Sequence, residues 1–442
     1  MFLTMDSLQS LQQQLIQQMD AYQPCKNQPE ITALTAKIQL EQNLLAWLKA
    51  QQDYPQFYLH CRADSPNEQE NHIAAIGQVR TFTTVNHAQT FVRRADFTLV
   101  GGMTFNGECD FYLPRLLLRQ VDGELTATLF IDSQKDLSVE KQLAGKCLKN
   151  FTKSVALEPV VQSVRLVEKK ATQAQWCEWV EQALLEIKKG SFTKVVLANE
   201  SIFSSRQPIN AIDFLAESEK KNTGCYHFFF AQKADYAFIG SSPERLYLRN
   251  GQYLQTEALA GTAVMSDDEE QNQRQGEWLL KDEKNEYENM LVVEDICGNI
   301  ESFTQNIEVQ SVELKRLRLV QHLRRKIFAK LTALTADEAC LNAIHPTAAV
   351  AGLPKQNALR FLAKTETFER SWYAGTLGFM NRARAEFCVT LRSAFVEQNR
   401  IRVFAGAGIV AGSVPLLEWQ EIERKASGLL SLLQNSGEHI CQ

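Results

Sequence analysis

Several features that mark other classes of protein are missing from this sequence of 442 residues. No apolar run approaches the roughly 18 residues that a membrane-spanning helix needs. Residues 1–20 lack the basic start and the small-residue cleavage site of a secretory signal. Basic residues form no long block, and 47 Lys and Arg against 52 Asp and Glu leave a net charge of −5. We therefore expect a protein that binds neither membranes nor nucleic acids.

Closely spaced cysteine pairs are also missing. The ten cysteines are scattered between Cys25 and Cys441 and include no C-x-x-C pair, which argues against a disulfide framework or a structural zinc site. Reduced, scattered thiols are typical of the cytosol, so we expect a cytoplasmic protein. Apolar residues at 45% and charged residues at 22% predict a folded globular chain.

The strand patterns occur mostly as hairpins. Asn250-Gly251, a strong signal for a tight turn, lies within a predicted hairpin over residues 247–258. A second hairpin is predicted from residues 386–396 and 400–404. Because the predicted helices are grouped between such hairpins, the pattern favours an α+β fold with antiparallel sheets over a parallel, doubly wound one.

Long helices are predicted in the second part of the chain. Residues 269–300 form either one helix or two that break near Asp282, and the last helix begins after Ser413 as N-cap and ends near residue 434. A mixed, hydrophilic stretch over residues 134–175 indicates a join. We therefore divide the chain into an N-terminal region, residues 1–150, which contributes strands to the sheets, and a catalytic domain, residues 151–442.

The last predicted helix carries Glu418, Glu421 and Lys425 on one face, because their spacing is i, i+3, i+7. Ion pairs on a solvated surface explain this spacing without any function. The functional alternative is a pair of carboxylates that binds Mg²⁺ beside a lysine that contacts an anionic ligand. Glu288, just before an apolar run in the helix over 269–300, has the same two interpretations.

Three charged residues lie within or between predicted strands. Lys194 interrupts an apolar strand, where it either protects a sheet edge or acts as a buried base. Glu244 lies in a turn beside Arg245, where an ion pair is the simple explanation and a partly buried general acid is the alternative. Arg392 lies in an apolar strand and needs a carboxylate partner from the protein or from a ligand.

Eight motifs occur in one order that resembles the chorismate-utilising enzymes, which include anthranilate synthase large subunits, aminodeoxychorismate synthases, salicylate synthases and isochorismate synthases. The resemblance covers about residues 175–430. The motifs are Lys194-Val-Val-Leu-Ala, Ser241-Ser-Pro-Glu-Arg-Leu, Thr256-Glu-Ala-Leu-Ala-Gly-Thr, Glu288-Asn-Met-Leu-Val-Val-Glu-Asp, His345-Pro-Thr-Ala-Ala-Val-Ala-Gly-Leu-Pro, Phe387-Cys-Val-Thr-Leu-Arg-Ser-Ala, Ala405-Gly-Ala-Gly-Ile-Val and Glu418-Trp-Gln-Glu-Ile-Glu-Arg-Lys-Ala.

Three positions discriminate between branches of that family. Lys194 stands where ammonia-using anthranilate synthases carry Gln, which implies water as the nucleophile. Ala260 stands where aminodeoxychorismate synthases carry a nucleophilic lysine, and Ala349 stands where enzymes that eliminate pyruvate tend to carry Thr. Together with Asn289 after Glu288, these residues resemble the menaquinone-pathway isochorismate synthases. A salicylate synthase, which isomerises chorismate and then eliminates pyruvate, is the nearest alternative.

The resemblance implies a fold like that of anthranilate synthase component I: two large, mostly antiparallel sheets packed together, with helices outside. It implies chorismate as substrate, Mg²⁺ as cofactor and no obligatory amidotransferase subunit. Lys194 is then the general base and Glu244 the general acid. Glu288 and Glu421 are the implied Mg²⁺ ligands, with Glu418 nearby. The implied substrate contacts are Thr262, His345, Thr347, Ala349, Tyr373, Arg392, Gly406 and Lys425.

Overall fold

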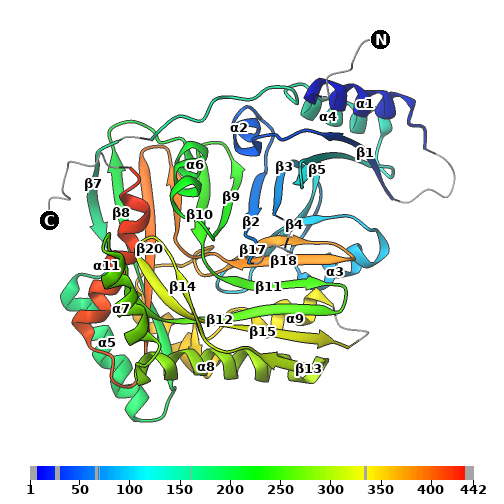
Figure 1. Cartoon of the computed structure of the whole chain (residues 1–442). Helices are drawn as coiled ribbons and strands as arrows, with labels where there is room; N and C mark the ends of the chain where they lie inside the picture. Colours follow the sequence, from blue (N-terminus) through cyan, green and yellow to red (C-terminus); the bar gives the residue numbers. More distant parts are fainter. Residues whose placement is uncertain are drawn as a thin grey trace.

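The computed structural model describes residues 7–24, 30–64, 68, 70–160, 162–332 and 336–433. Every strand pairing in this part of the chain is antiparallel. Figure 1 shows the strands at the centre of the molecule and the helices around them. This arrangement confirms the predicted α+β class with antiparallel sheets.

The first sheet begins with strands from the N-terminal region and continues into the C-terminal part of the chain. It pairs its strands in the order β1 (Ile31–Gln39), β6 (Glu124–Asp132), β5 (Cys109–Val121), β3 (Asn71–Phe82), β2 (Gln56–Cys61), β9 (Tyr226–Lys233), β10 (Tyr236–Ser242), β19 (Ser393–Glu397), β20 (Arg400–Ile409) and β8 (Lys194–Ser205), with β7 (Val164–Lys169) and the short β16 (Gly352–Leu353) along β8.

The second sheet branches from the start of β5. Its order is β4 (Leu99–Met103), β17 (Thr376–Met380), β18 (Arg384–Val389), β11 (Arg245–Asn250), β12 (Tyr253–Val264) and β15 (Val320–Leu331), with β13 (Thr304–Val309) and β14 (Glu313–Arg316) along β15. Because β5 pairs with both β3 and β4, the two sheets form one hydrogen-bonded system.

The helices pack on the outer faces. They are α1 (Leu8–Ala21), α2 (Leu44–Lys49), α3 (Val85–Arg94), α4 (Leu137–Leu148), α5 (Gln173–Lys188), α6 (Ala211–Lys221), α7 (Glu269–Leu279), α8 (Glu283–Ile300), α9 (Asp337–Ile344), α10 (Lys355–Thr365) and α11 (Pro415–Leu430). Two of them matter for the site, since α8 packs on β12 and α11 packs on β20. None of the described helices is long and apolar enough to cross a membrane.

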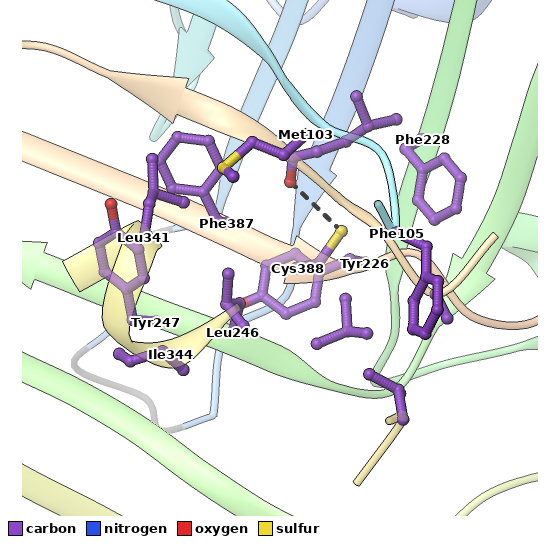
Figure 2. Close-up of a cluster of buried hydrophobic side chains, with 14 of the residues drawn as sticks. Met103, Phe105, Tyr226, Phe228, Leu246, Tyr247, Leu341, Ile344, Phe387 and Cys388 are labelled. Atoms are coloured by element: carbon purple, nitrogen blue, oxygen red, sulfur yellow. Dashed lines mark hydrogen bonds between the residues drawn. The ribbon is translucent and has the colours of Figure 1, made fainter. Parts of the chain in front are cut away.

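Large apolar side chains from both sheets meet in the core, as Figure 2 shows. Phe228 comes from the first sheet, whereas Tyr247 and Phe387 come from the second and lie with ring centroids 5.4 Å apart. The Cys388 thiol donates a hydrogen bond to the Leu377 carbonyl at 3.5 Å. Eight cysteines in the described part of the chain are free thiols, and Cys25 and Cys441 lie outside it.

The structure corrects two of the predicted elements and resolves a third. Residues 386–396 are not one strand, because Arg392 has φ of +49° and separates β18 from β19. Ser413 is not the N-cap of α11; its hydroxyl accepts a hydrogen bond from the Val410 N–H instead. The region 269–300 forms two helices, and the Asp282 side chain caps the second by accepting from the Asn285 N–H at 2.9 Å.

Hydrogen bonding and charge join residues 1–150 to the rest of the chain. Strand β2 pairs with β9, and β4 pairs with β17. Behind β2 lies a charged seam, which we define as Arg62, Asp64, Arg245, Glu257 and Arg324. Arg62 contacts Glu257 at 2.6 Å, and Asp64 contacts Arg324 at 2.8 Å and Arg245 at 3.2 Å. The division at residue 150 stays a prediction, since strand pairings and ion pairs join the residues before it to the residues after it.

The charged seam generates a stability prediction. Arg62→Met leaves the buried Glu257 carboxylate without its nearest cation, so we expect the free energy of unfolding to fall by about 3–5 kcal/mol in urea denaturation. Lys37→Met breaks the exposed pair between Lys37 and Glu124, whose atoms are 2.9 Å apart, and should change stability far less. Equal losses for both variants would contradict a structural role for the seam.

Candidate active site

One cavity of about 710 Å³ lies where α8 and α11 face the ends of β8, β12 and β20. Its lining residues include Glu244, Ala260, Gly261, Thr262, Glu288, His322, Ala349, Tyr373, Arg392, Gly406, Gly408, Glu421 and Lys425. Most of the residues that the sequence singled out therefore come together, although they are spread over residues 244–425.

Lys194 is the first residue of β8, and its side chain is fully buried behind the cavity wall. Its Nζ lies 3.1 Å from Glu288 Oε1 on α8, and Glu288 lines the cavity. Gly408 on the neighbouring strand allows this approach, because a Cβ there would lie 2.2 Å from Glu288 Oε1 and 3.0 Å from Lys194 Cε. The lysine is thus a buried amine with a carboxylate neighbour, and the alternative of an exposed edge lysine does not hold.

Glu421 and Lys425 lie one turn apart on α11 and face the cavity together. Lys425 Nζ is 2.5 Å from Glu421 Oε1 and donates to the Gly406 carbonyl at 2.9 Å. Although burial opposes ionisation, the Lys425 ammonium lowers the pKa of Glu421 to about 2. Glu421 therefore presents a carboxylate at neutral pH, and Thr262 Oγ1 donates to it at 3.2 Å.

Glu418 is buried one turn before Glu421, but it does not line the cavity. Its carboxylate accepts from Lys284 Nζ at 2.8 Å. Burial, followed by the Glu421 carboxylate, raises the pKa of Glu418. Burial also opposes the charge on Lys284, yet Glu418, and then Glu288 and Glu421, raise its pKa. The carboxyl groups of Glu288, Glu418 and Glu421 therefore lie near one another, and carboxylate oxygens are ligands that Mg²⁺ prefers.

Glu244 lies in the turn between β10 and β11, and 2% of it is exposed. Glu244 lines the cavity, and its Oε1 has no hydrogen-bond partner in the described part of the protein. Burial, followed by repulsion from the Glu257 carboxylate, raises the pKa of Glu244 from 4.5 to about 8. The simple explanation of an ion pair with Arg245 does not hold, because Arg245 instead contacts Asp64, Glu68 and Glu386. Glu244 is a protonated acid at neutral pH.

Arg392 enters the cavity through the left-handed break between β18 and β19. Its Nη2 is 3.3 Å from His322 Nε2, and His322 Nδ1 is 3.1 Å from the Gly261 carbonyl. Burial, followed by Arg392 and Lys425, lowers the pKa of His322 to about 3, so this ring is neutral. Sequence reasoning missed His322 as a site residue, because a single histidine on a strand carries no spacing signal that assigns its side chain to a cavity.

Tyr373, Gly406 and Ala349 also line the cavity. The Tyr373 ring stacks on Phe404 with centroids 5.1 Å apart, and burial raises the pKa of its hydroxyl to about 12. Gly406 allows the Tyr373 hydroxyl to come close, because a Cβ on Gly406 would lie 3.0 Å from it. These residues form an uncharged part of the cavity wall.

Two residues of the predicted substrate loop lie elsewhere. His345 lines a different cavity, and its Nε2 lies 2.9 Å from the Thr104 carbonyl. Thr347 is buried, and its hydroxyl accepts from the Ala349 N–H at 3.2 Å, which holds the turn that brings Ala349 to the wall. His345 and Thr347 therefore do not line the catalytic cavity, and direct substrate contact by these two residues stays a prediction.

Comparison with known proteins is consistent with this geometry. The family described as "Chorismate binding enzyme" matches residues 103–434. A protein named "Isochorismate synthase MenF" from Pasteurella multocida is 55% identical over 436 residues, which is 98% of this chain and 100% of that protein. Its namesake from Escherichia coli is 41% identical over 395 residues, covering 88% of this chain and 90% of that one.

Solved structures agree with the sequence matches. One described as "Structure and Mechanism of MenF, the Menaquinone-Specific Isochorismate Synthase from Escherichia Coli" superposes with a TM-score of 0.90 at 38% identity, covering 97% of this chain and all of that one. Anthranilate synthase component I from Streptococcus pneumoniae, at 19% identity and a TM-score of 0.60, shares the fold over 92% of this chain and 94% of its own. The family match spans most of the cavity-forming strands and helices, and so this chain belongs to the chorismate-binding enzymes.

Proposed function

We propose that this chain is an isochorismate synthase that converts chorismate to isochorismate with Mg²⁺, as the first step towards menaquinone. The observation that carries the proposal is that Glu244, which is protonated at neutral pH, lines the cavity, while the Lys194 amine is buried behind the same wall, 3.1 Å from the Glu288 carboxylate that also lines it. The names of the most similar relatives support the same activity. Ala260 and Ala349 on the cavity wall favour addition of water over the amination or pyruvate elimination found elsewhere in the family.

The reaction moves a hydroxyl group from C4 to C2 of the ring. Glu244 donates a proton to the departing hydroxyl, which leaves as water, while the double bonds shift. A second water attacks C2, and Lys194 accepts its proton. The proton then returns from Lys194 to Glu244 through solvent, so the sum is an isomerisation. Each acid or base contributes roughly 10² to 10⁴ in rate.

Two groups of side chains would hold the substrate and the metal ion. Arg392 and Lys425 offset the negative charge of the substrate carboxylates, and Tyr373 orients the ring of the substrate. Glu288 and Glu421 would hold Mg²⁺, with Glu418 behind them. When bound, the ion supplies positive charge for the ring carboxylate and withdraws electron density from the diene.

Product identification tests the activity itself. The purified chain, incubated with chorismate and Mg²⁺ without any partner subunit, should yield isochorismate by NMR and mass. Lactate dehydrogenase in the same tube should detect no pyruvate. Release of pyruvate would establish the salicylate synthase alternative, and a requirement for ammonia or an amidotransferase would overturn the proposal.

The base assignment predicts that Lys194→Met lowers kcat by roughly 10² or more while the Kd for chorismate changes little. The physical reason is that the substrate carboxylates are bound by other cations. Lys315→Met is the matched control, because Lys315 is also buried in the protein but contacts Asp64 instead of the cavity. Equal loss of binding and turnover in Lys194→Met would remove Lys194 from the role of base.

The acid assignment predicts a pH dependence. Glu244 donates a proton only in its neutral form, and its pKa is raised to about 8, so kcat/KM should fall as the pH rises through 8. Glu244→Gln should lose this alkaline limb together with most of the activity, while circular dichroism shows a folded protein. A rate that stays constant from pH 7 to pH 9.5 would contradict the assignment.

The metal assignment predicts that EDTA stops turnover and that Mg²⁺ restores it. Glu421→Gln should raise the Mg²⁺ concentration for half-maximal activity at least about tenfold, because one ligand loses its charge. Glu423→Gln is the matched control, since Glu423 lies on the same helix but pairs with Lys169 outside the cavity at 2.6 Å. Full activity after exhaustive chelation would refute the metal site.

A further inference from the structure

Three histidines lie side by side in the first sheet, among residues that do not line the catalytic cavity. His60 on β2 is the cross-strand partner of His72 on β3 and of His227 on β9. Directly paired residues share one face of a sheet. The His60 ring stacks on His72 with centroids 3.8 Å apart and lies 5.5 Å from the His227 ring. Three of the seven histidines in the chain thus gather in one row.

A carboxylate reaches the same row from helix α6, which packs on β9 and β10 beside β2 (Figure 1). Glu219 Oε1 lies 2.5 Å from His60 Nδ1. In the group of His60, Glu219 and His227, one donor atom from each residue lies within 4.8 Å of the others. Tetrahedral zinc, with bonds of about 2.0–2.2 Å, separates its donors by about 3.4 Å, so small side-chain rotations bring these atoms to ligand positions.

Neighbouring side chains hold two of these residues in place. His227 Nδ1 is hydrogen-bonded with Ser241 Oγ at 2.8 Å, which leaves Nε2 of this ring for a ligand. The Tyr58 hydroxyl donates to Glu219 Oε1 at 3.0 Å. Such partners commonly orient metal-binding histidines and carboxylates. His227 is buried, whereas the side chains of His60 and Glu219 are 18% and 24% exposed, so an ion can reach the group from solvent.

We propose that His60, Glu219 and His227 bind a divalent transition-metal ion of the zinc type, at a site separate from the catalytic cavity. Two imidazole nitrogens and one carboxylate suit Zn²⁺, whereas Mg²⁺ prefers oxygen ligands alone. Three protein ligands leave one position for water. The ion joins β2 of the N-terminal region to β9 and α6, so its binding stabilises the native chain.

Metal binding to the full chain tests this proposal with a readout that does not depend on activity. Protein treated with a chelator is dialysed against Zn²⁺ in the presence of excess Mg²⁺, which occupies the carboxylates of the catalytic cavity. We expect one tightly bound Zn²⁺ per chain and a Tm that rises with free Zn²⁺. Co²⁺ in its place should give the visible absorption bands of a tetrahedral ion.

Variants distinguish the proposed ligands from their neighbours. Glu219→Gln and His227→Gln should each weaken Zn²⁺ binding at least about tenfold. His72→Gln should leave it unchanged, because His72 stacks on His60 but is not one of the three proposed ligands. His87→Gln on the exposed face of α3 controls for nonspecific binding.

The outcomes separate the alternatives. His60 and His72 also form a second group with Glu70, whose Oε2 lies 3.9 Å and 4.0 Å from their Nε2 atoms. Loss of Zn²⁺ binding in His72→Gln but not in Glu219→Gln would place the ion there and overturn the proposed ligand set. Zn²⁺ binding that survives in both Glu219→Gln and His227→Gln would overturn it as well. Because Glu219 lies on a helix and is partly exposed, its variant remains informative if His227→Gln does not fold.

Discussion

The chemistry of the cavity depends on an unequal pairing of buried charges. Glu288 has the Lys194 amine beside it, and Glu421 has Lys425, so each of these two side chains has a nitrogen neighbour in a region of low dielectric. Glu244 has no such partner, and the Glu257 carboxylate disfavours its ionisation further. Glu244 therefore keeps its proton at neutral pH while Glu421, which has the same type of side chain, is ionised, and acid–base catalysis requires such a difference.

The backbone makes this pairing possible at two positions. Gly408 on β20 has no side chain, so the Lys194 amine and the Glu288 carboxylate occupy the space next to it. Arg392 has a left-handed conformation that ends β18 and starts β19, and its guanidinium lines the cavity instead of continuing the alternation of a strand. A substitution with any larger residue at Gly408 would displace the two charged groups at once. The site is thus defined by strand geometry as much as by its charged side chains.

The N-terminal region supports the same site from a distance. Arg62 at the end of β2 contacts both Glu257 and the carbonyl of Pro243, the residue before Glu244. Glu257 in turn raises the pKa of Glu244, so the charged seam sets the charge environment of the acid. The histidine row crosses the same strand β2, and Ser241, which forms a hydrogen bond with His227, is three residues before Glu244. Arg62 and His60, which lie far outside the eight motifs, therefore contribute to the surroundings of the turn that contains Glu244.

Several local features and the family could be predicted from the amino-acid sequence alone. The turn at Asn250-Gly251 and the helix break at Asp282 depend on residues close by in the sequence. The ordered motifs predicted that one site contains Glu244, Glu288, Glu421 and Lys425, and all four line the cavity. Which ionisable side chains pair depends on the folded chain, because Lys194 and Glu288 lie on two elements that are distant in the sequence. The tertiary structure also brought His322 into the cavity and left His345 behind it, and it raised the pKa of Glu244. Burial and charge environment arise from contacts between remote segments, which no local pattern encodes.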